Sequence, residues 1–317
     1  ELLDEPVLVL ESPDMNATLR PRYAADVLNY ADPSDPFALY KAAVVFRGIV
    51  PSDTPLDADL ADTLRPGGYG LRLTTATSIP RGSGLGTSSI LAGAILHCLA
   101  KLLDQDVGLA RLFDEVLCLE QMITTGGGWQ DQIGGLVGGI KLITTQPGLP
   151  QVAHIEPVPL TPTLKRALDE RLVLIYTGQR RLAKNLLRAV MGRWMARDPQ
   201  MVAVLRGMGE LALSIRDALL AEDLDTFGEL IARHWEMYKL TDPGCTNPFI
   251  DDLLALCQPY MMGAKLAGAG GGGFAIVIAR DKSAALALRE VIRTRFPQGN
   301  VAVWECEVAE EALVDDA

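Results

Sequence analysis

The sequence is poor in histidine and in basic residues. Its three histidines, His97, His154 and His234, lie far apart, so neither a zinc site nor a Ser-His-Asp triad is indicated. Lys and Arg number 29 against 40 Asp and Glu, which gives a formal net charge of -11. Nucleic acid binding needs grouped basic residues to neutralise phosphates, so nucleic acid is not an expected partner.

Cysteine pairs and long apolar runs are also absent. The five cysteines are odd in number and scattered, which favours free thiols in a reducing compartment over a disulfide framework. No apolar run reaches the ~18 residues expected of a membrane span. The first residues, Glu-Leu-Leu-Asp-Glu, contain no signal-peptide core. We therefore expect a cytoplasmic protein without membrane contact.

The composition that remains is that of a core-forming chain. Of the 317 residues, 49% are hydrophobic and 22% charged. Single cores stop growing at about 250–300 residues, so two lobes are expected. The proline-rich patch 147–162 is the expected boundary, which divides the chain into lobes 1–160 and 161–317. Periodicity predicts strands at 6–12, 68–75, 140–145, 171–177, 274–279 and 300–308, and helices at 37–48, 90–103, 109–124, 180–197, 200–220, 224–240, 248–260 and 283–296.

A glycine-rich turn at residues 80–89, Pro-Arg-Gly-Ser-Gly-Leu-Gly-Thr-Ser-Ser, lies between a predicted strand and a long apolar helix. Glycines let the backbone approach a polyphosphate closely, and free N–H groups at a helix start attract anions. The pattern is neither a P-loop nor G-x-G-x-x-G. The alternative is a plain turn whose Ser and Thr residues cap the next helix.

Two acids stand near a second glycine-rich stretch, residues 126–139. Asp131 lies within it, where a carboxylate can approach a substrate hydroxyl and accept its proton, and Glu120 lies on the preceding predicted helix, where it could complete a magnesium shell with Ser88. The alternatives are a turn aspartate and a solvated helix residue. Trp129 would either stack on a sugar ring or fill core.

A third glycine-rich segment, Lys-Leu-Ala-Gly-Ala-Gly-Gly-Gly-Gly-Phe, occupies residues 265–274. A run of four glycines loses much conformational entropy on folding, so a plain hairpin explains it poorly. Its presence together with the first loop is more specific than either segment alone.

These segments together resemble the motifs of GHMP kinases, the superfamily of galactokinase, homoserine kinase and mevalonate kinase. The resemblance implies a two-lobed α+β fold, with an N-terminal lobe like domain 2 of ribosomal protein S5 and a ferredoxin-like C-terminal lobe. It implies ATP and Mg²⁺ as cofactors, Asp131 as the catalytic residue, and Ser88 with Glu120 as metal ligands. The residues implied to bind the nucleotide are Pro80, Gly82, Ser83, Gly84, Leu85, Gly86, Thr87, Ser88, Ser89, Gly270 and Gly271.

A finer resemblance is to L-fucokinases, which phosphorylate the anomeric hydroxyl of L-fucose and are often fused to a nucleotidyltransferase. It is carried by Asp-Pro-Phe-Ala-Leu-Tyr-Lys-Ala-Ala at 35–43, Thr-Thr-Gly-Gly-Gly-Trp-Gln-Asp-Gln at 124–132, Tyr-Thr-Gly-Gln-Arg-Arg-Leu-Ala-Lys-Asn-Leu-Leu at 176–187 and Lys-Leu-Thr-Asp-Pro-Gly-Cys at 239–245. The implied partners are ATP, a sugar and a fused nucleotidyltransferase domain. Heptose-phosphate kinases share part of this character and are the alternative. Thr177, Gly178 and Arg181 could contact sugar or phosphate, or Thr177 could simply cap a helix.

One departure from the superfamily pattern concerns its first motif, an N-terminal segment that resembles Gly-Gly-Gly-Trp-Ser-Asp-Thr-Pro. No such segment occurs in this sequence. Either the chain is a fragment of a longer protein, or the segment was cleaved or lost. The rival expectation is a non-catalytic nucleotide- or sugar-binding module with a kinase-like fold.

Overall fold

The computed structural model describes residues 1–32, 34–124, 127–148, 151–179 and 184–312. The chain forms two compact units, one from residues 1–79 and 87–136 and the other from residues 80–86 and 137–312. The first glycine-rich loop therefore belongs to the second unit, although the helix that follows it belongs to the first. The division into lobes at residue 160 stays a prediction.

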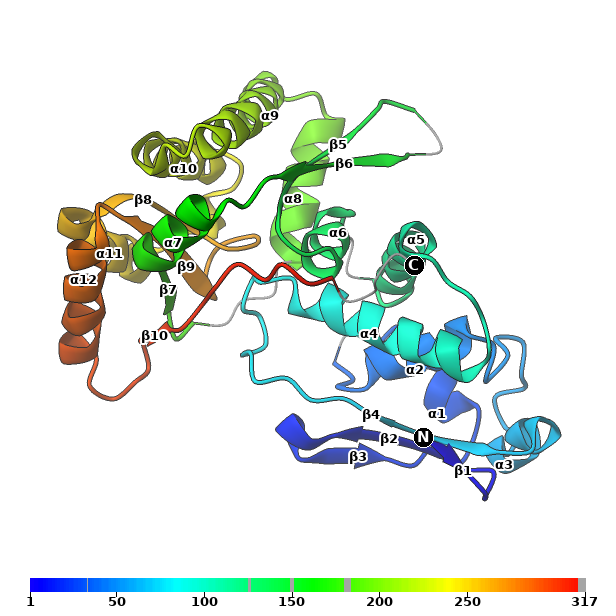
Figure 1. Cartoon of the computed structure of the whole chain (residues 1–317). Helices are drawn as coiled ribbons and strands as arrows, with labels where there is room; N and C mark the ends of the chain where they lie inside the picture. The colour runs from blue at the N-terminus through cyan, green and yellow to red at the C-terminus, as the bar shows by residue number, and fades with distance from the viewer. Residues whose placement is uncertain (33, 125–126, 149–150, 180–183, 313–317) are drawn as a thin grey trace. The chain divides into compact units, whose positions relative to one another are not determined.

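The first unit packs helices on one face of a small sheet (Figure 1). The strand order is β1-β4-β2-β3, with β2 and β4 parallel and the other neighbours antiparallel. Its core joins alternate residues of β2 and β4 to the apolar faces of α2, α4 and α5. The elements are β1 (Leu2–Leu3), β2 (Leu8–Ser12), β3 (Ala17–Leu19), α1 (Ala25–Leu28), α2 (Ala38–Phe46), α3 (Leu60–Leu64), β4 (Gly70–Thr74), α4 (Thr87–Leu102), α5 (Leu109–Met122) and α6 (Gln130–Leu136).

A buried arginine ties three of these helices together. Arg47, at the end of α2, donates to the Leu96 carbonyl of α4 at 2.8 Å and to the Glu115 carboxylate of α5 at 2.6 Å. Only 3% of the Arg47 side chain and 8% of the Glu115 side chain are exposed. Removal of Glu115 would leave the buried Arg47 guanidinium without its ion-pair partner, so this ion pair fixes how α4 and α5 face each other.

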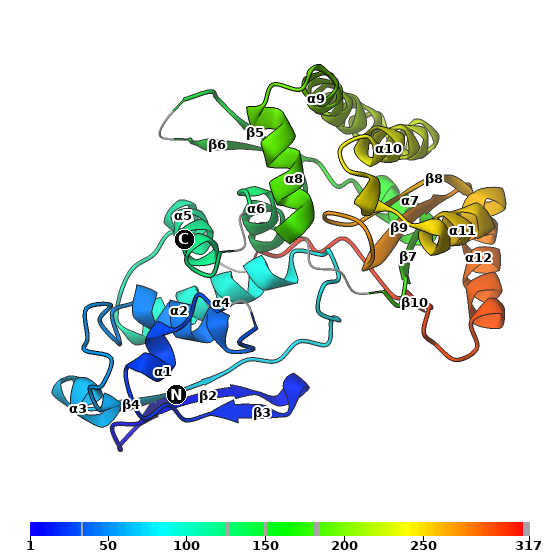
Figure 2. The ribbon, with the colours of Figure 1, turned by 180° about the vertical axis from the view of Figure 1, so that it is seen from behind.

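The second unit contains an antiparallel sheet of order β10-β7-β9-β8 and a hairpin of β5 and β6. Helix α10 packs on strand β8 at the edge of the sheet, as seen from behind in Figure 2. The elements are β5 (Ile140–Thr145), β6 (Ala153–Val158), α7 (Pro162–Arg171), β7 (Leu172–Tyr176), α8 (Lys184–Met195), α9 (Pro199–Leu220), α10 (Leu224–Lys239), α11 (Pro248–Cys257), β8 (Met261–Leu266), β9 (Phe274–Ala279), α12 (Lys282–Arg295) and β10 (Ala302–Trp304).

Polar caps define where the helices of this unit begin. A side-chain oxygen accepts a hydrogen bond from the first turn at Thr161, Asp198, Asp223, Asn247 and Asp281. Proline follows the cap in α7, α9 and α11, where its missing N–H costs no hydrogen bond. These local signals explain why the predicted starts of α9, α10 and α11 lie within a residue of the observed ones.

Three features of the chain's organisation were not predicted. Residues 130–136, within the glycine-rich stretch around Asp131, form helix α6. The proline-rich patch 147–162 contains residues 153–158, which form β6 and pair with β5 from Ile140 to Thr145. Strand β8 was not predicted at all, although its six residues pair with β9 along most of their length.

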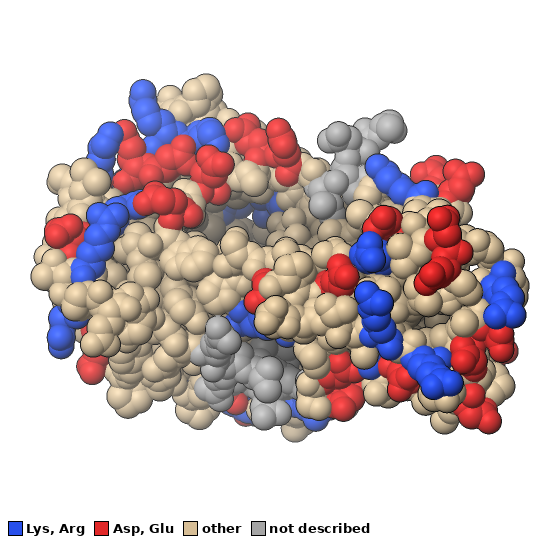
Figure 3. Space-filling model, turned by 90° about the horizontal axis from the view of Figure 1, so that it is seen from below, with Lys and Arg blue, Asp and Glu red and all other residues tan. Residues whose placement is uncertain are grey.

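Charged side chains of both signs lie on one face of the molecule (Figure 3). On the face drawn in Figure 3, acidic and basic side chains are interspersed, and the described residues form no broad basic patch there. Within the described ranges, no helix combines the length and the apolarity needed to cross a membrane.

Candidate active site

The two glycine-rich loops of the second unit pack against each other backbone to backbone. Gly84 has a φ of +78°, and a Cβ there would lie 2.5 Å from the Ala267 carbonyl oxygen. Gly273 has a φ of +80°, and a Cβ there would lie 2.3 Å from the Ser83 carbonyl oxygen. The Phe274 amide donates to that same oxygen at 3.0 Å. Any side chain at these two positions would both strain the backbone and collide with the opposite loop.

Strand β7 supports the second loop from its other side. Thr177 is 1% exposed, and both its amide and its hydroxyl donate to the Gly273 carbonyl, at 2.9 Å and 2.8 Å. The Gly273 amide in turn donates to the Gln179 carbonyl at 2.9 Å. Thr177 therefore anchors the loop, and residues 177–179 are not helical. Arg180 and Arg181 lie outside the described residues.

A third support comes from the turn after α10. The Cys245 carbonyl accepts a hydrogen bond from the Gly271 amide at 2.5 Å, and a Cβ on Gly270 would lie 2.4 Å from the same oxygen. Asn247 donates to the Gln179 side chain at 2.9 Å. The glycine run is thus surrounded by backbone groups from three separate segments, which is why so many of its positions exclude a side chain.

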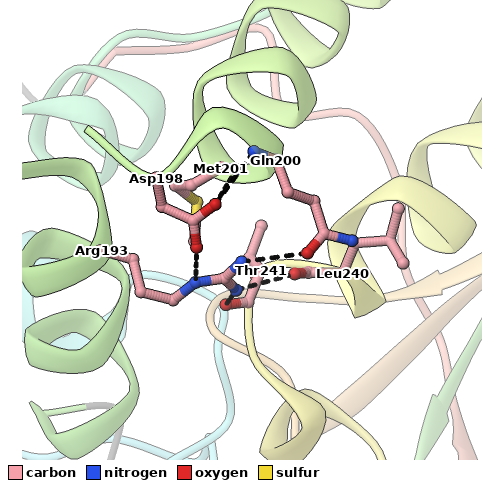
Figure 4. Close-up of polar contacts among 6 residues, drawn as sticks. All are labelled: Arg193, Asp198, Gln200, Met201, Leu240 and Thr241. Atoms are coloured by element: carbon pink, nitrogen blue, oxygen red, sulfur yellow. Dashed lines mark hydrogen bonds and ion pairs between the residues drawn. The ribbon is translucent and has the colours of Figure 1, made fainter. Parts of the chain in front are cut away.

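Arg193 connects that turn to two neighbouring helices (Figure 4). From α8 its guanidinium donates to the Asp198 carboxylate at 2.8 Å, and to the carbonyls of Leu240 and Thr241 at 3.0 Å and 2.9 Å. Asp198 also caps α9. One planar donor therefore fixes the end of α10, four residues before the Cys245 carbonyl that contacts the glycine loop.

The two predicted acids lie in the first unit with a buried set of oxygen and nitrogen groups. Glu120, on α5, is 6% exposed. It accepts a hydrogen bond from the Ser89 hydroxyl of α4 at 2.6 Å and another from the Gln132 amide of α6 at 2.6 Å. Asp131 precedes Gln132 on α6 and its side chain is exposed. The three helices thus bring Ser89, Glu120 and the Asp131–Gln132 pair into one part of the unit.

Glycines allow the close packing that holds this cluster. A Cβ on Gly135 would lie 2.3 Å from Ile90 of α4, and a Cβ on Gly93 would lie 2.6 Å from Leu136 of α6. Gly135 therefore belongs to a helix contact. This contact is a physical reason why residues 130–136 form a helix against α4.

The surroundings raise the pKa of both carboxyl groups, although Asp131 as a whole residue is exposed. Desolvation raises the pKa of Glu120, repulsion from Asp131 raises it further, and the bonds from Ser89 and Gln132 act in the opposite direction. Desolvation also raises the pKa of Asp131. A carboxylate with a raised pKa is a stronger proton acceptor than an ordinary one, which suits the role of a general base.

The donor set around Glu120 fits a magnesium ion. Mg²⁺ prefers oxygen ligands and takes one or two carboxylates from the protein. The buried Gln132 side-chain oxygen has no hydrogen-bond partner among the described residues. It lies on the same amide whose nitrogen contacts Glu120, so an oxygen without a donor stands beside a buried acid. A cation bound nearby would contact both the Glu120 carboxylate and this amide oxygen.

The residues predicted to form the site differ in their exposure and in their contacts. Ser88 is exposed at the start of α4, and the observed α4 partner of Glu120 is its neighbour Ser89, which is 3% exposed. Gly270 and Gly271 lie in the loop that packs on residues 83–84. The binding and catalytic roles of all these residues stay predictions.

Sequence reasoning missed Gln132 and the supporting roles of Gln179 and Cys245. Gln132 is fully buried, and a polar residue that follows Asp131 in a glycine-rich stretch carries no local sign of burial. Gln179 and Cys245 act through their backbone carbonyls, which no side-chain pattern indicates.

Comparison with known proteins adds to this geometry. The family model "GHMP kinases N terminal domain" matches residues 58–139, and "GHMP kinases C terminal" matches residues 215–298. The bifunctional fucokinase/GDP-fucose pyrophosphorylase of Arabidopsis thaliana is 40% identical over 257 residues, 81% of this chain and 23% of that protein. The L-fucokinase/L-fucose-1-P guanylyltransferase of Bacteroides fragilis is 32% identical over 311 residues, 96% of this chain and 32% of that protein. This chain therefore spans about a quarter to a third of the length of these relatives.

A more distant relative and a solved structure are also kinases. The D-glycero-alpha-D-manno-heptose 7-phosphate kinase of Campylobacter jejuni is 25% identical over 206 residues, 64% of this chain and 59% of that protein. A crystal structure of mevalonate kinase superposes with a TM-score of 0.68 at 16% identity, covering 98% of this chain and 88% of that one. The expected two-lobed α+β fold is confirmed by this likeness. Because both halves of the family model match in order and the fold agrees, the chain belongs to the GHMP kinase family.

Proposed function

We propose that this chain transfers the terminal phosphoryl group of ATP to the anomeric hydroxyl of L-fucose, giving fucose 1-phosphate. The observation that carries the proposal is the identity of 40% and 32% to two proteins named as fucokinases, over 81% and 96% of this chain. The glycine loops and the acid cluster supply the groups that phosphoryl transfer requires, namely phosphate donors and a base.

In the proposed mechanism, different residues accept the proton, bind the phosphates and hold the metal ion. Asp131 accepts the proton of the sugar hydroxyl. The freed oxygen attacks the γ-phosphorus, and the bond from that phosphorus to the β–γ bridging oxygen breaks to release ADP. Backbone N–H groups of residues 82–87 bind the phosphate oxygens. Bound Mg²⁺ neutralises phosphate charge, and we assign Ser88 and Glu120 to hold it.

Gln132 positions the acid cluster in this proposal. Its amide holds one Glu120 oxygen at 2.6 Å while Ser89 holds the other at 2.6 Å. Both bonds orient the carboxylate before any ligand arrives. A preoriented group loses little freedom during the reaction, so this order contributes to rate rather than to affinity alone.

The test is ADP release from Mg-ATP with L-fucose, galactose, a heptose 7-phosphate and mevalonate as candidate acceptors. We expect turnover on L-fucose. The Asp131→Asn variant should lose about 10²- to 10⁴-fold in kcat, the usual contribution of a general base, and bind ATP nearly as before. Asp114→Asn, at an exposed position of α5, is the matched control and should keep its activity.

Other outcomes would change the proposal in defined ways. Turnover on the heptose phosphate alone would replace L-fucose by a heptose, as the Campylobacter relative suggests. Unchanged kcat in Asp131→Asn would remove Asp131 from the mechanism. ATP binding without turnover on any acceptor, in this chain and in the longer fused protein, would favour a non-catalytic nucleotide-binding module.

A further inference from the structure

A cavity of about 230 Å³ in the second unit is lined by none of the residues of the glycine loops at 80–86 and 268–273. It is lined by residues of the hairpin strands β5 and β6, of α9 and α10, and of β8. In Figure 1 the hairpin runs beside α9, and these two elements are in contact. Most of the wall is aliphatic, with Ile140, Leu142, Val158, Ile215 and Leu219 among the lining residues.

Four nitrogen-bearing side chains reach this apolar cavity from four different elements. They are Lys141 on β5, Arg216 on α9, His234 on α10 and Lys265 on β8. Arg216 is already neutralised by Glu156 at 3.2 Å and Asp217 at 2.7 Å. Lys141 donates to the Val137 carbonyl. The positive charge that is least compensated therefore belongs to Lys265.

The orientation of Lys265 follows from the strand period. Its neighbours Ala264 and Leu266 are buried in the core on one face of the sheet, so Lys265 points to the other face, towards α10. Among the described residues its ammonium group makes no hydrogen bond and no ion pair. An unpaired charge in an apolar wall is costly, and burial accordingly lowers the pKa of Lys265.

His234, on α10, lines the same cavity as Lys265. Its buried Nδ1 has no hydrogen-bond partner within the part of the chain that the structure describes. Burial, aided by the charge of Lys265, lowers the pKa of His234 to about 4, so the ring is neutral at pH 7. Within the described residues, His234 Nδ1 is thus a buried polar atom without a hydrogen-bond partner, although such atoms normally find one, and Lys265 faces the same cavity from β8.

We propose that this cavity binds a small organic anion, a molecule with one carboxylate or phosphate group and a short apolar body, anchored by Lys265. The anion would pair with the ammonium of Lys265, and His234 would complete the polar end. The aliphatic wall would cover the carbon chain. A volume slightly below the usual 300–1,000 Å³ of ligand pockets limits the ligand to a few carbons beyond the charged group.

The three histidines of the chain allow a direct test on the intact protein. With ¹⁵N-labelled histidine, only His234 lines the cavity, whereas His97 and His154 report on other places. n-Butyl phosphate, butyrate, inorganic phosphate and n-butanol are titrated separately, and His234→Gln assigns the signal. We expect saturable shifts of the His234 signal with butyl phosphate or butyrate, and none at the other two histidines.

Variants separate the anchor from general charge effects. Lys265→Met should weaken binding of the organic anion at least tenfold, whereas Lys282→Met, at an exposed position that pairs with Glu170, should leave it unchanged. If Lys265→Met does not fold, Lys141→Met and the wild-type shift pattern carry the test. The proposal is overturned if neither butyl phosphate nor butyrate causes saturable His234 shifts at concentrations up to roughly 10 mM, where even weak millimolar binding would be detected. It is also overturned if n-butanol or inorganic phosphate binds as well as the organic anions.

Discussion

Glu120 is a buried acid whose environment disfavours its charge when no ligand is present. Desolvation and repulsion from Asp131 raise its pKa above the unfolded value. The native state therefore binds the proton more tightly than the unfolded state. The resulting loss of stability is full above the raised pKa and disappears as the pH falls below the unfolded value of about 4.5.

We predict that Glu120→Gln stabilises the metal-free, nucleotide-free protein at neutral pH. The uncharged amide removes the desolvation cost, and the Gln132 oxygen, which lacks a partner, can accept a bond from the new amide after rotation. Melting temperatures measured from pH 4 to pH 8 should show a gain that grows with pH. Glu5→Gln, an exposed change in the same unit, is the control. A gain independent of pH would contradict the argument.

The same residue cluster shows the limit of motif reasoning. The glycine pattern predicts that hydroxyls follow Gly86, and the resemblance implies Ser88 as the metal ligand with Glu120, but no motif states which serine contacts Glu120 in the fold. Successive residues on a helix point about 100° apart, so the partner is chosen by how α4 packs, through Gly93 and Leu136, on α6. The observed bond to Glu120 comes from Ser89.

At the scale of elements, the packing of the two glycine loops sets a strict size limit at Gly273. Gly273→Ala would place its Cβ 2.3 Å from the Ser83 carbonyl. Gly299 has a similar φ, +71° against +80°, but no atom lies within 4 Å of its Cβ position. Both alanine variants incur the left-handed backbone cost of ~1–2 kcal/mol, and only Gly273→Ala adds a collision, ~1–3 kcal/mol.

We therefore expect Gly273→Ala to melt several degrees lower than Gly299→Ala and to bind ATP more weakly. Differential scanning calorimetry and nucleotide titration of the two variants measure both effects. Equal melting temperatures would mean that the two loops do not press together in solution. Normal ATP affinity in a destabilised Gly273→Ala variant would separate the loop contact from nucleotide binding.

Arg193 gives a second prediction at this scale. Arg193→Met removes the bonds to Asp198, Leu240 and Thr241, and Thr241 is only 3% exposed. A buried carbonyl without its donor costs ~1–3 kcal/mol, and the partial exposure of Arg193 favours the lower end of this range. Arg197→Met, four residues away and exposed, should be nearly neutral. Urea unfolding of both variants is the measurement. Equal unfolding midpoints would contradict a stabilising role of the Arg193 hydrogen bonds.

At the scale of the whole molecule, the chain matches only part of its two named relatives. Both relatives carry a nucleotidyltransferase activity in their names, and the chain spans 23% and 32% of their lengths. Both family models lie within this chain and describe a kinase. Under the proposed function this chain carries out the kinase step, and fusion to a nucleotidyltransferase domain stays a prediction.

This assignment predicts the product of a coupled assay. With L-fucose, ATP and GTP, the chain should form fucose 1-phosphate and ADP, but no GDP-fucose. Addition of a separate enzyme that joins fucose 1-phosphate to GTP should restore GDP-fucose formation. Chromatography of the nucleotide products distinguishes the cases, and GDP-fucose made by the chain alone would show that the boundary of activities lies elsewhere.

The sequence by itself determined the local features of this protein. Caps such as Asp198 and Asp223, the period of α10 and the glycine loops at 80–86 and 268–273 are set by neighbouring residues, so they could be predicted. The tertiary structure decided the rest: that 130–136 is a helix, that Ser89 and Gln132 hold Glu120, and that Lys265 and His234 face one cavity. Those facts depend on contacts between residues far apart in the chain, and such contacts leave no local pattern because burial and packing, not propensity, select them.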